Sequence, residues 1–141
     1  MLKCMSRDEL IAALRHALAE RNGIQLAMLF GSVARNRANP QSDIDVAVDA
    51  EPQVDLAELA SALGIAVGRE VDVVRLSDAG VPLLEELVQD GIVLHEGVPH
   101  AAARWRSHTL ADLDTDRPWY ARMRDAWLRR VAQRGLGDGQ P

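Results

Sequence analysis

The stretch from Leu29 to Asp49, LFGSVARNRANPQSDIDVAVD, constrains the fold of this chain more than any other. It joins the end of an apolar run to Gly31-Ser32 and, after ten residues, to Asp43 and Asp45 at the head of a second apolar run. Side chains two residues apart on a strand lie on the same face, so the two aspartates project together. The stretch predicts two strands joined through a glycine-serine turn, with two carboxylates aimed at one place.

Two neighbouring carboxylates repel each other, and aligning them at a strand start costs stability unless a positive group receives them. Mg²⁺ fits this position best, because it prefers one or two carboxylates together with substrate phosphate oxygens. The phosphates would bind at the other end of the stretch. There Gly31 allows close approach of the backbone, Ser32 offers a hydroxyl, and residues 33–37 begin a short helix with free N–H groups. The pattern predicts a site for a metal and a nucleotide.

Each half of the pattern alone is weak, since glycine-serine turns and Asp-x-Asp strand edges are common structural features. Their combination, GSVAR followed by SDIDVAV, resembles the signature of the nucleotidyltransferase superfamily, in which G-S precedes D-x-D by a short spacer. The resemblance implies an α/β (α+β) fold of the polymerase-beta-like kind. We therefore expect a mixed central sheet flanked by helices, followed by a C-terminal helical tail.

That superfamily uses a third carboxylate, and the chain offers two for the role. Asp72 lies in the middle of the apolar run at 70–75, where an aspartate is costly unless it is paired or bound to metal. Glu70 shares its face by strand alternation, but its place at the strand start favours solvent. We expect Asp72 to be the third carboxylate and keep Glu70 as the alternative.

The resemblance implies metal-dependent transfer chemistry with ATP as the substrate and two Mg²⁺ ions as cofactors. The acidic set that would bind both ions and carry the catalysis is Asp43, Asp45 and Asp72. The set that would bind the nucleotide is Gly31, Ser32 and Arg35. Arg37 is a further candidate for a phosphate contact, although exposed arginines are commonly mere surface charge.

Within the superfamily, residues 5–96 look most like the minimal nucleotidyltransferases that serve as antitoxins of HEPN/MNT toxin–antitoxin systems. This implies transfer of AMP from ATP to a tyrosine of a HEPN ribonuclease toxin, which silences the toxin. One departure is Asn36, where the family commonly has glycine, but asparagine tolerates the left-handed conformation better than other non-glycine residues. Two alternatives stay open: an antitoxin that neutralises by binding alone, and a transferase acting on small molecules such as aminoglycosides.

Length and composition favour one domain with a sizeable core, because 141 residues with 48% hydrophobic content hardly suffice for two. Gly97-Val98-Pro99 is the clearest composition break. It divides residues 1–98, the expected nucleotidyltransferase domain, from 99–141, a helical extension. Four of the five aromatic residues and eight arginines lie in this extension, and tryptophan and arginine dominate protein interfaces. We expect it to bind the partner, in a homo- or hetero-oligomer, unless its tryptophans pack onto the body.

Charge and hydropathy argue against a nucleic-acid-binding, a membrane or a secreted protein. The net charge is −5, and residues 1–100 are acidic while residues 101–141 are basic, so an extended nucleic-acid surface is not expected on the body. No run approaches the roughly 20 apolar residues of a membrane span, and the N-terminal residues lack the apolar core of a secretory signal. The cytoplasm is the expected location.

Hydrophobic spacing and punctuation by Gly and Pro predict the remaining elements. A capping box at Ser6 to Glu9 begins the first helix. Helices are expected at 7–21, 33–37, 54–63, 79–90, 100–113 and 117–134. Strands are expected at 24–30, 43–48, 70–75 and 92–96.

Overall fold

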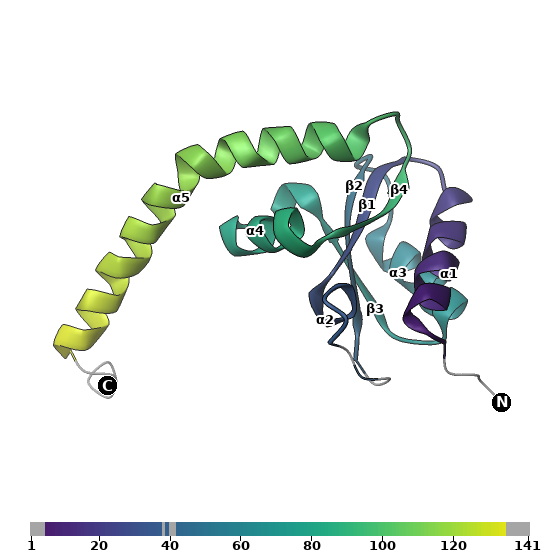
Figure 1. The fold of residues 1–141 in the computed structure, drawn as a ribbon, viewed down its shortest axis with the longest axis horizontal. Coiled ribbons are helices and arrows are strands. Elements are labelled where there is room, and N and C mark those ends of the chain that lie inside the picture. The colour runs from purple at the N-terminus through teal and green to yellow at the C-terminus, as the bar shows by residue number, and fades with distance from the viewer. Residues whose placement is uncertain (1–4, 38, 40–41, 135–141) are drawn as a thin grey trace.

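A computed structural model describes residues 5–37, 39 and 42–134, without the side chains of residues 116, 117, 120 and 134. The described residues form a mixed sheet of four strands in the order β3-β2-β1-β4 (Figure 1). β1 (Ile24–Phe30) pairs antiparallel with β2 (Ile44–Ala50) and with β4 (Ile92–Glu96), while β2 pairs parallel with β3 (Val71–Arg75). The predicted mixed sheet flanked by helices is confirmed.

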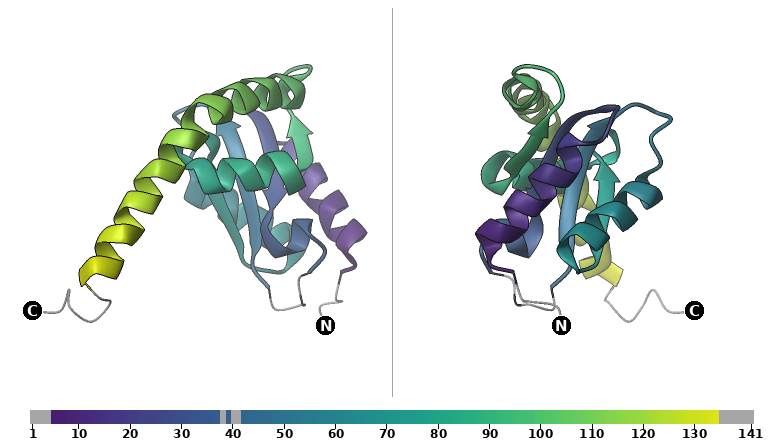
Figure 2. Two further views of the ribbon diagram at one scale, coloured as in Figure 1. Left: turned by 60° about the vertical axis from the view of Figure 1, so that its left-hand side comes forward. Right: turned by 90° about the vertical axis from the view of Figure 1, so that its right-hand side faces the viewer.

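Helices cover both faces of the sheet, as Figure 2 shows. α1 (Arg7–Ala19) and α3 (Leu56–Val67) pack on one face and enclose the larger cluster of buried residues, which includes Leu14, Leu63 and Val46. α4 (Val81–Asp90) and the beginning of α5 (Ala101–Arg134) cover the other face with a smaller cluster. The two clusters follow the alternation of the strands, since neighbouring residues of one strand belong to opposite faces.

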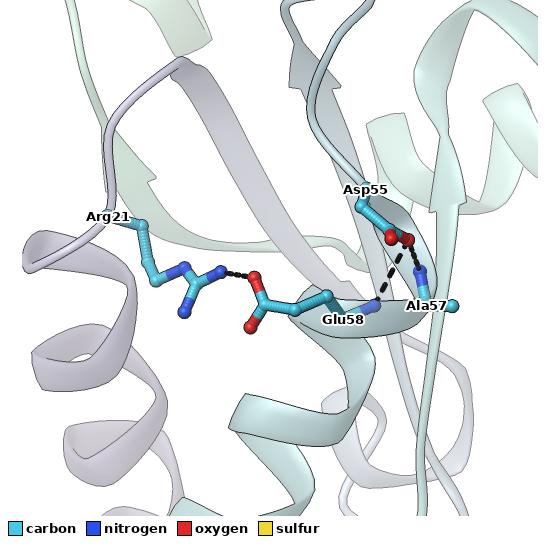
Figure 3. Close-up of polar contacts among 4 residues, drawn as sticks. All are labelled: Arg21, Asp55, Ala57 and Glu58. Atoms are coloured by element: carbon cyan, nitrogen blue, oxygen red, sulfur yellow. Dashed lines mark hydrogen bonds and ion pairs between the residues drawn. The ribbon is translucent and has the colours of Figure 1, made fainter.

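Polar contacts at the helix ends join α1 to α3 (Figure 3). Asp55 is the N-cap of α3, and its Oδ1 accepts hydrogen bonds from the backbone N–H groups of Ala57 and Glu58 at 3.0 and 3.2 Å. Arg21, just after α1, forms an ion pair with the Glu58 carboxylate. The predicted capping box of α1 is also confirmed, because Ser6 and Glu9 exchange side-chain to backbone hydrogen bonds.

Several predicted boundaries are wrong. α2 (Gly31–Ala34) begins at the glycine of the turn rather than at residue 33. α3 does not stop at Gly64, because its apolar stripe continues to Val67, and it ends where Gly68 adopts a φ of +66°. β2 extends to Ala50 because it pairs with β1 as far as Ile24, which lies opposite Ala50. A short 3-10 helix, η1 (Leu76–Asp78), precedes α4.

The prediction of two C-terminal helices is wrong, because α5 runs unbroken from Ala101 to Arg134 with Pro118 inside it. Proline lacks a backbone N–H and clashes with the carbonyl four residues before it, which bends a helix without necessarily ending it. Figures 1 and 2 show α5 bending partway along and extending beyond α4. Its first half is anchored by buried Ala101, Thr109 and Leu113. No helix in the described part of the chain is long and apolar enough to cross a membrane.

Replacing Leu63 with alanine tests the larger core. Leu63 is fully buried, so the variant leaves a cavity, and the free energy of unfolding should fall by about 2–5 kcal/mol in urea denaturation. Ile65→Ala on the same helix is the matched control, because Ile65 is 84% exposed and its loss should change stability by less than about 0.5 kcal/mol. Equal effects of the two variants would contradict the packing described for α3.

Candidate active site

The glycine-serine turn lies where β1 ends and α2 begins. Gly31 has a φ of +80°, a left-handed conformation that favours glycine. A Cβ on Gly31 would lie 2.4 Å from Oδ2 of Asp45, so any larger residue would push that carboxylate away. Asn36 also has a positive φ, +58°, which confirms that asparagine takes the left-handed position of this loop. The turn thus places the backbone directly against the Asp45 side chain.

Arg7 of α1 donates hydrogen bonds to the C-terminal end of α2, directly after this turn. Its Nε donates to the carbonyl of Val33 at 2.9 Å and its Nη2 donates to the carbonyl of Ala34 at 2.8 Å. Both carbonyls belong to the last two residues of α2, and the Val33 carbonyl also accepts from Asn36 N–H at 3.1 Å. Ser32 is half-buried and lies between Gly31 and the two residues that Arg7 contacts, so α1 helps to fix its position.

β2 carries Asp45 between the turn and the third predicted carboxylate. In the sheet, Asp45 pairs with Phe30 of β1 and with Asp72 of β3. Neighbouring strands are about 4.8 Å apart and paired residues project to the same face, so Asp45 and Asp72 lie side by side. Asp43, exposed, comes one residue before β2. All three predicted aspartates therefore gather at one end of the sheet, next to Gly31.

Glu70, the alternative third carboxylate, precedes β3 and is exposed. Its backbone carbonyl accepts a hydrogen bond from Ile44 N–H at 3.0 Å, which continues the pairing of β2 with β3. Asp72 is directly opposite Asp45, whereas Glu70 lies outside the paired residues. Both residues border an open cavity of about 840 Å³ between α3 and β3. Asp72 is exposed as well, so exposure does not distinguish the two. The register of the sheet favours Asp72 as the partner of Asp45.

The charges of this end of the sheet act on Asp45. Burial is the largest cause that raises the pKa of the Asp45 carboxyl above its ordinary value of 3.8. Neighbouring negative charges raise this pKa further, in the order Asp72, Asp43 and Glu86, and the positive charge of Arg35 opposes them. Four carboxylates from three segments thus share one electrostatic environment, and a positive charge among them would be stabilising.

Glu86 is a site residue that the sequence did not reveal. It lies on α4, and its Oε2 accepts a hydrogen bond from Gly31 N–H at 2.9 Å and from Arg35 Nη1 at 2.7 Å. Its side chain is 28% exposed. In the sequence it stands among the leucines of α4, and only this unusual position of a glutamate beside an apolar stripe could have indicated a polar partner. Arg35 and Gly31 N–H, both predicted to bind phosphate, are thus paired with a carboxylate.

The carboxylates of Asp43, Asp45 and Asp72 suit a hard cation in their chemistry, although their side chains do not yet converge on one point. Carboxylate oxygens are the protein ligands that Mg²⁺ prefers, and a divalent cation would offset both the burial and the neighbouring charges that raise the pKa of Asp45. Among the residues that the structure describes, no three Asp, Glu, His or Cys side chains already converge tightly enough to hold a metal. Metal binding here requires the aspartate side chains to rotate toward one another.

Comparison with known proteins places the chain among nucleotide-transferring proteins. The family described as polymerase beta, nucleotidyltransferase matches residues 13–98. The protein adenylyltransferase MntA of Shewanella oneidensis is 33% identical over 90 residues, which cover 62% of this chain and 63% of that protein. The chain thus matches less than two thirds of the length of this curated relative.

Solved structures agree with this over more of the chain. A crystal structure of a toxin–antitoxin with AMP-PNP superposes with a TM-score of 0.65 at 28% identity, covering 87% of this chain and 99% of that chain. A tri-AMPylated HEPN toxin of Shewanella oneidensis in complex with an MNT antitoxin gives a TM-score of 0.58 at 27% identity, covering 86% and 95%. The expected polymerase-beta-like fold and the resemblance to minimal nucleotidyltransferases of toxin–antitoxin systems are confirmed.

The electrostatics of the site predict a measurable titration. A raised pKa in the folded state means that the stability contributed by the protonated carboxyl is fully present below pH 3.8 and is lost as the pH rises through the folded-state pKa. Among the neighbouring charges, Asp72 raises the pKa of Asp45 most, so Asp72→Asn should lower this pKa toward 3.8. The loss of stability between pH 3.8 and the folded-state pKa should then be smaller than in the unaltered protein. Carbon-13 NMR titration of the Asp45 carboxyl and urea unfolding across this pH range measure both effects.

Glu70→Gln is the control, because it removes a carboxylate from the same edge that does not contribute to the raised pKa of Asp45. An Asp45 titration that moves equally in the two variants would contradict the side-by-side placement of Asp45 and Asp72.

Proposed function

Because the chain belongs to the polymerase beta nucleotidyltransferase family, we propose that it is an antitoxin enzyme that transfers AMP from ATP to a tyrosine hydroxyl of a HEPN ribonuclease toxin. The modification would neutralise the toxin. The similarity to toxin–antitoxin structures, one with AMP-PNP and one with a tri-AMPylated HEPN toxin, supports both the nucleotide and the partner. The observation that carries the proposal is Asp45, placed against Gly31 on one side and Asp72 on the other.

Asp43, Asp45 and Asp72 would hold two Mg²⁺ ions. Bound there, the ions would neutralise the triphosphate and lower the pKa of the incoming hydroxyl. The cluster repels itself without a cation, as the raised pKa of Asp45 indicates, so its carboxylates gain most when they share metal charge.

The remaining residues would position ATP. Gly31 N–H and the Ser32 hydroxyl would donate to the β- and γ-phosphates, and the Arg35 guanidinium would add a charged contact. The tyrosine oxygen would attack the α-phosphorus in line, forming a new P–O bond while the bond to the β-phosphate breaks and pyrophosphate leaves. Asp72 would help to receive the phenolic proton. The protein then contributes mainly orientation and charge.

We further propose that residues 99–141 form the extension that binds the toxin, with residues 1–98 as the catalytic domain. Trp105 packs against the smaller core, but Trp119, Met123 and Trp127 are 56%, 49% and 55% exposed. Their spacing of four residues places them on one side of α5. Exposed tryptophans at helical spacing suit a protein interface. The match to a toxin–antitoxin chain covers 87% of this chain, which must include part of α5.

The catalytic prediction concerns the first two aspartates. Incubation of the protein with ATP, Mg²⁺ and its HEPN toxin should add one or more AMP masses to the toxin, measured by intact-protein mass spectrometry. The double variant Asp43→Asn/Asp45→Asn should slow this by at least about 100-fold, the lower range of what the loss of one group that stabilises transition-state charge costs.

The choice of the third carboxylate can be tested in the same assay. Asp72→Asn should lose transfer, whereas Glu70→Gln should retain it. No mass gain with the unaltered protein, or equal rates for it and the double aspartate variant, would rule out catalysis and leave neutralisation by binding alone.

The interface prediction uses the exposed tryptophans. Trp119→Ala/Trp127→Ala should weaken binding of the toxin at least about tenfold, since buried interface tryptophans commonly contribute more than this. Titration calorimetry with the Asp43→Asn/Asp45→Asn background separates binding from modification. Ile65→Ala, which removes an exposed apolar side chain elsewhere, is the control. Unchanged affinity for the tryptophan variant would contradict a role for this surface.

The cytoplasmic location expected from the sequence belongs to the same proposal, as does the homo- or hetero-oligomeric assembly with the toxin. Both follow from the proposed partner, and co-purification of the chain with a HEPN protein from cell extracts checks them together.

A further inference from the structure

The Glu86 carboxylate joins α4 to the turn at the end of β1. A single oxygen, Oε2, accepts from both Gly31 N–H and Arg35 Nη1, at 2.9 and 2.7 Å. Gly31 and Arg35 are neighbours in the turn, whereas Glu86 lies 55 residues after Gly31 in the chain. The contact therefore depends on how α4 packs on the sheet.

Glu86 is placed among negative charges. It raises the pKa of Asp45, as Asp72 and Asp43 do, and Arg35 is the group that lowers it. If Glu86 served only to pack α4 on the sheet, a position away from these carboxylates would stabilise the fold more, because like charges repel each other at short range. Helix α4 is also held by fully buried Leu87, next to Glu86, so the carboxylate is not needed to dock it.

A carboxylate oxygen and a phosphate oxygen compete for the same donors. Both are anionic acceptors, and both form short charge-assisted bonds with a guanidinium or a backbone N–H. The N–H of Gly31 has one hydrogen, so it cannot serve Glu86 and a phosphate at full strength together. The Glu86 side chain reaches solvent, 28% of it being exposed, and it can rotate away while α4 remains folded.

We propose that Glu86 is an intramolecular competitor of the nucleotide triphosphate, an anion that occupies Gly31 N–H and Arg35 until the phosphates displace it. The inference rests on the proposed function, since it assumes that a nucleotide binds at this turn. It makes Glu86 a residue that weakens nucleotide binding, keeps Arg35 in place between turnovers, and helps to release pyrophosphate by returning to its donors.

The variant Glu86→Gln tests this, because it removes the charge and keeps the length. Binding of AMP-PNP with Mg²⁺, measured by titration calorimetry, should become about tenfold tighter, the scale of one charge-assisted hydrogen bond. Asp90→Asn is the matched control: it removes one negative charge from an exposed position of the same helix and should leave the affinity unchanged. Urea unfolding of all variants shows whether each remains folded.

A second background tests the competition itself. In an Arg35→Ala background, one of the two donors for which Glu86 and the phosphates compete is absent. Glu86→Gln should then tighten binding of AMP-PNP by a smaller factor than it does in the unaltered protein. In the transfer assay, Glu86→Gln should lower KM for ATP while kcat stays the same or falls.

The outcomes separate this inference from the proposed function. Tighter binding by Glu86→Gln, or binding by this variant where the unaltered protein shows none, supports the competition. Equal or weaker binding overturns it and leaves the proposed nucleotide site standing, with Glu86 then acting as a residue that orients Arg35. Absence of AMP-PNP binding to every variant overturns both.

Discussion

The crowding of negative charge around Asp45 is the constraint on which the rest of this structure depends. Burial and three neighbouring carboxylates raise the pKa of Asp45, and these carboxylates come from the start of β2, from β3 and from α4. Such an arrangement destabilises the fold locally, so other interactions must hold it. The larger core under the opposite face of the sheet supplies that stability, and the register of β2 with β3 leaves the aspartates no freedom to move apart along the strands.

The turn at Gly31 shows how the rest of the molecule is built around this charge. Its positive φ and lack of a Cβ allow the backbone to lie against Asp45. Arg7 fixes the far side of α2 from a helix on the other face of the sheet, through two carbonyls. Arg7 thus ties the turn to α1, whereas the side chains of Glu86 and Arg35 reach solvent. Under the competition proposed above, only these two side chains need to move when phosphates bind.

Helix α5 combines two roles along its length. Its first half belongs to the fold, since Ala101, Thr109 and Leu113 are buried and Trp105 packs against the smaller core. Its second half extends past α4 and exposes large apolar side chains (Figure 1). Under the proposed function, this exposed half of α5 would contact the toxin that presents the acceptor tyrosine.

The sequence by itself determined the elements that follow local rules. Strand alternation predicted that Asp43 and Asp45 share a face, the capping box predicted the start of α1, and the G-S and D-x-D spacing predicted the family and its mixed sheet. Local rules failed at Gly64, where packing continued α3 to Val67, and at Pro118, which bends α5 without ending it. Only the tertiary structure decided which carboxylate lies opposite Asp45, because that depends on the register of a parallel pair. It alone brought Glu86 to Gly31 and Arg35, since a contact between residues 55 positions apart follows from how α4 docks on the sheet and not from any local pattern.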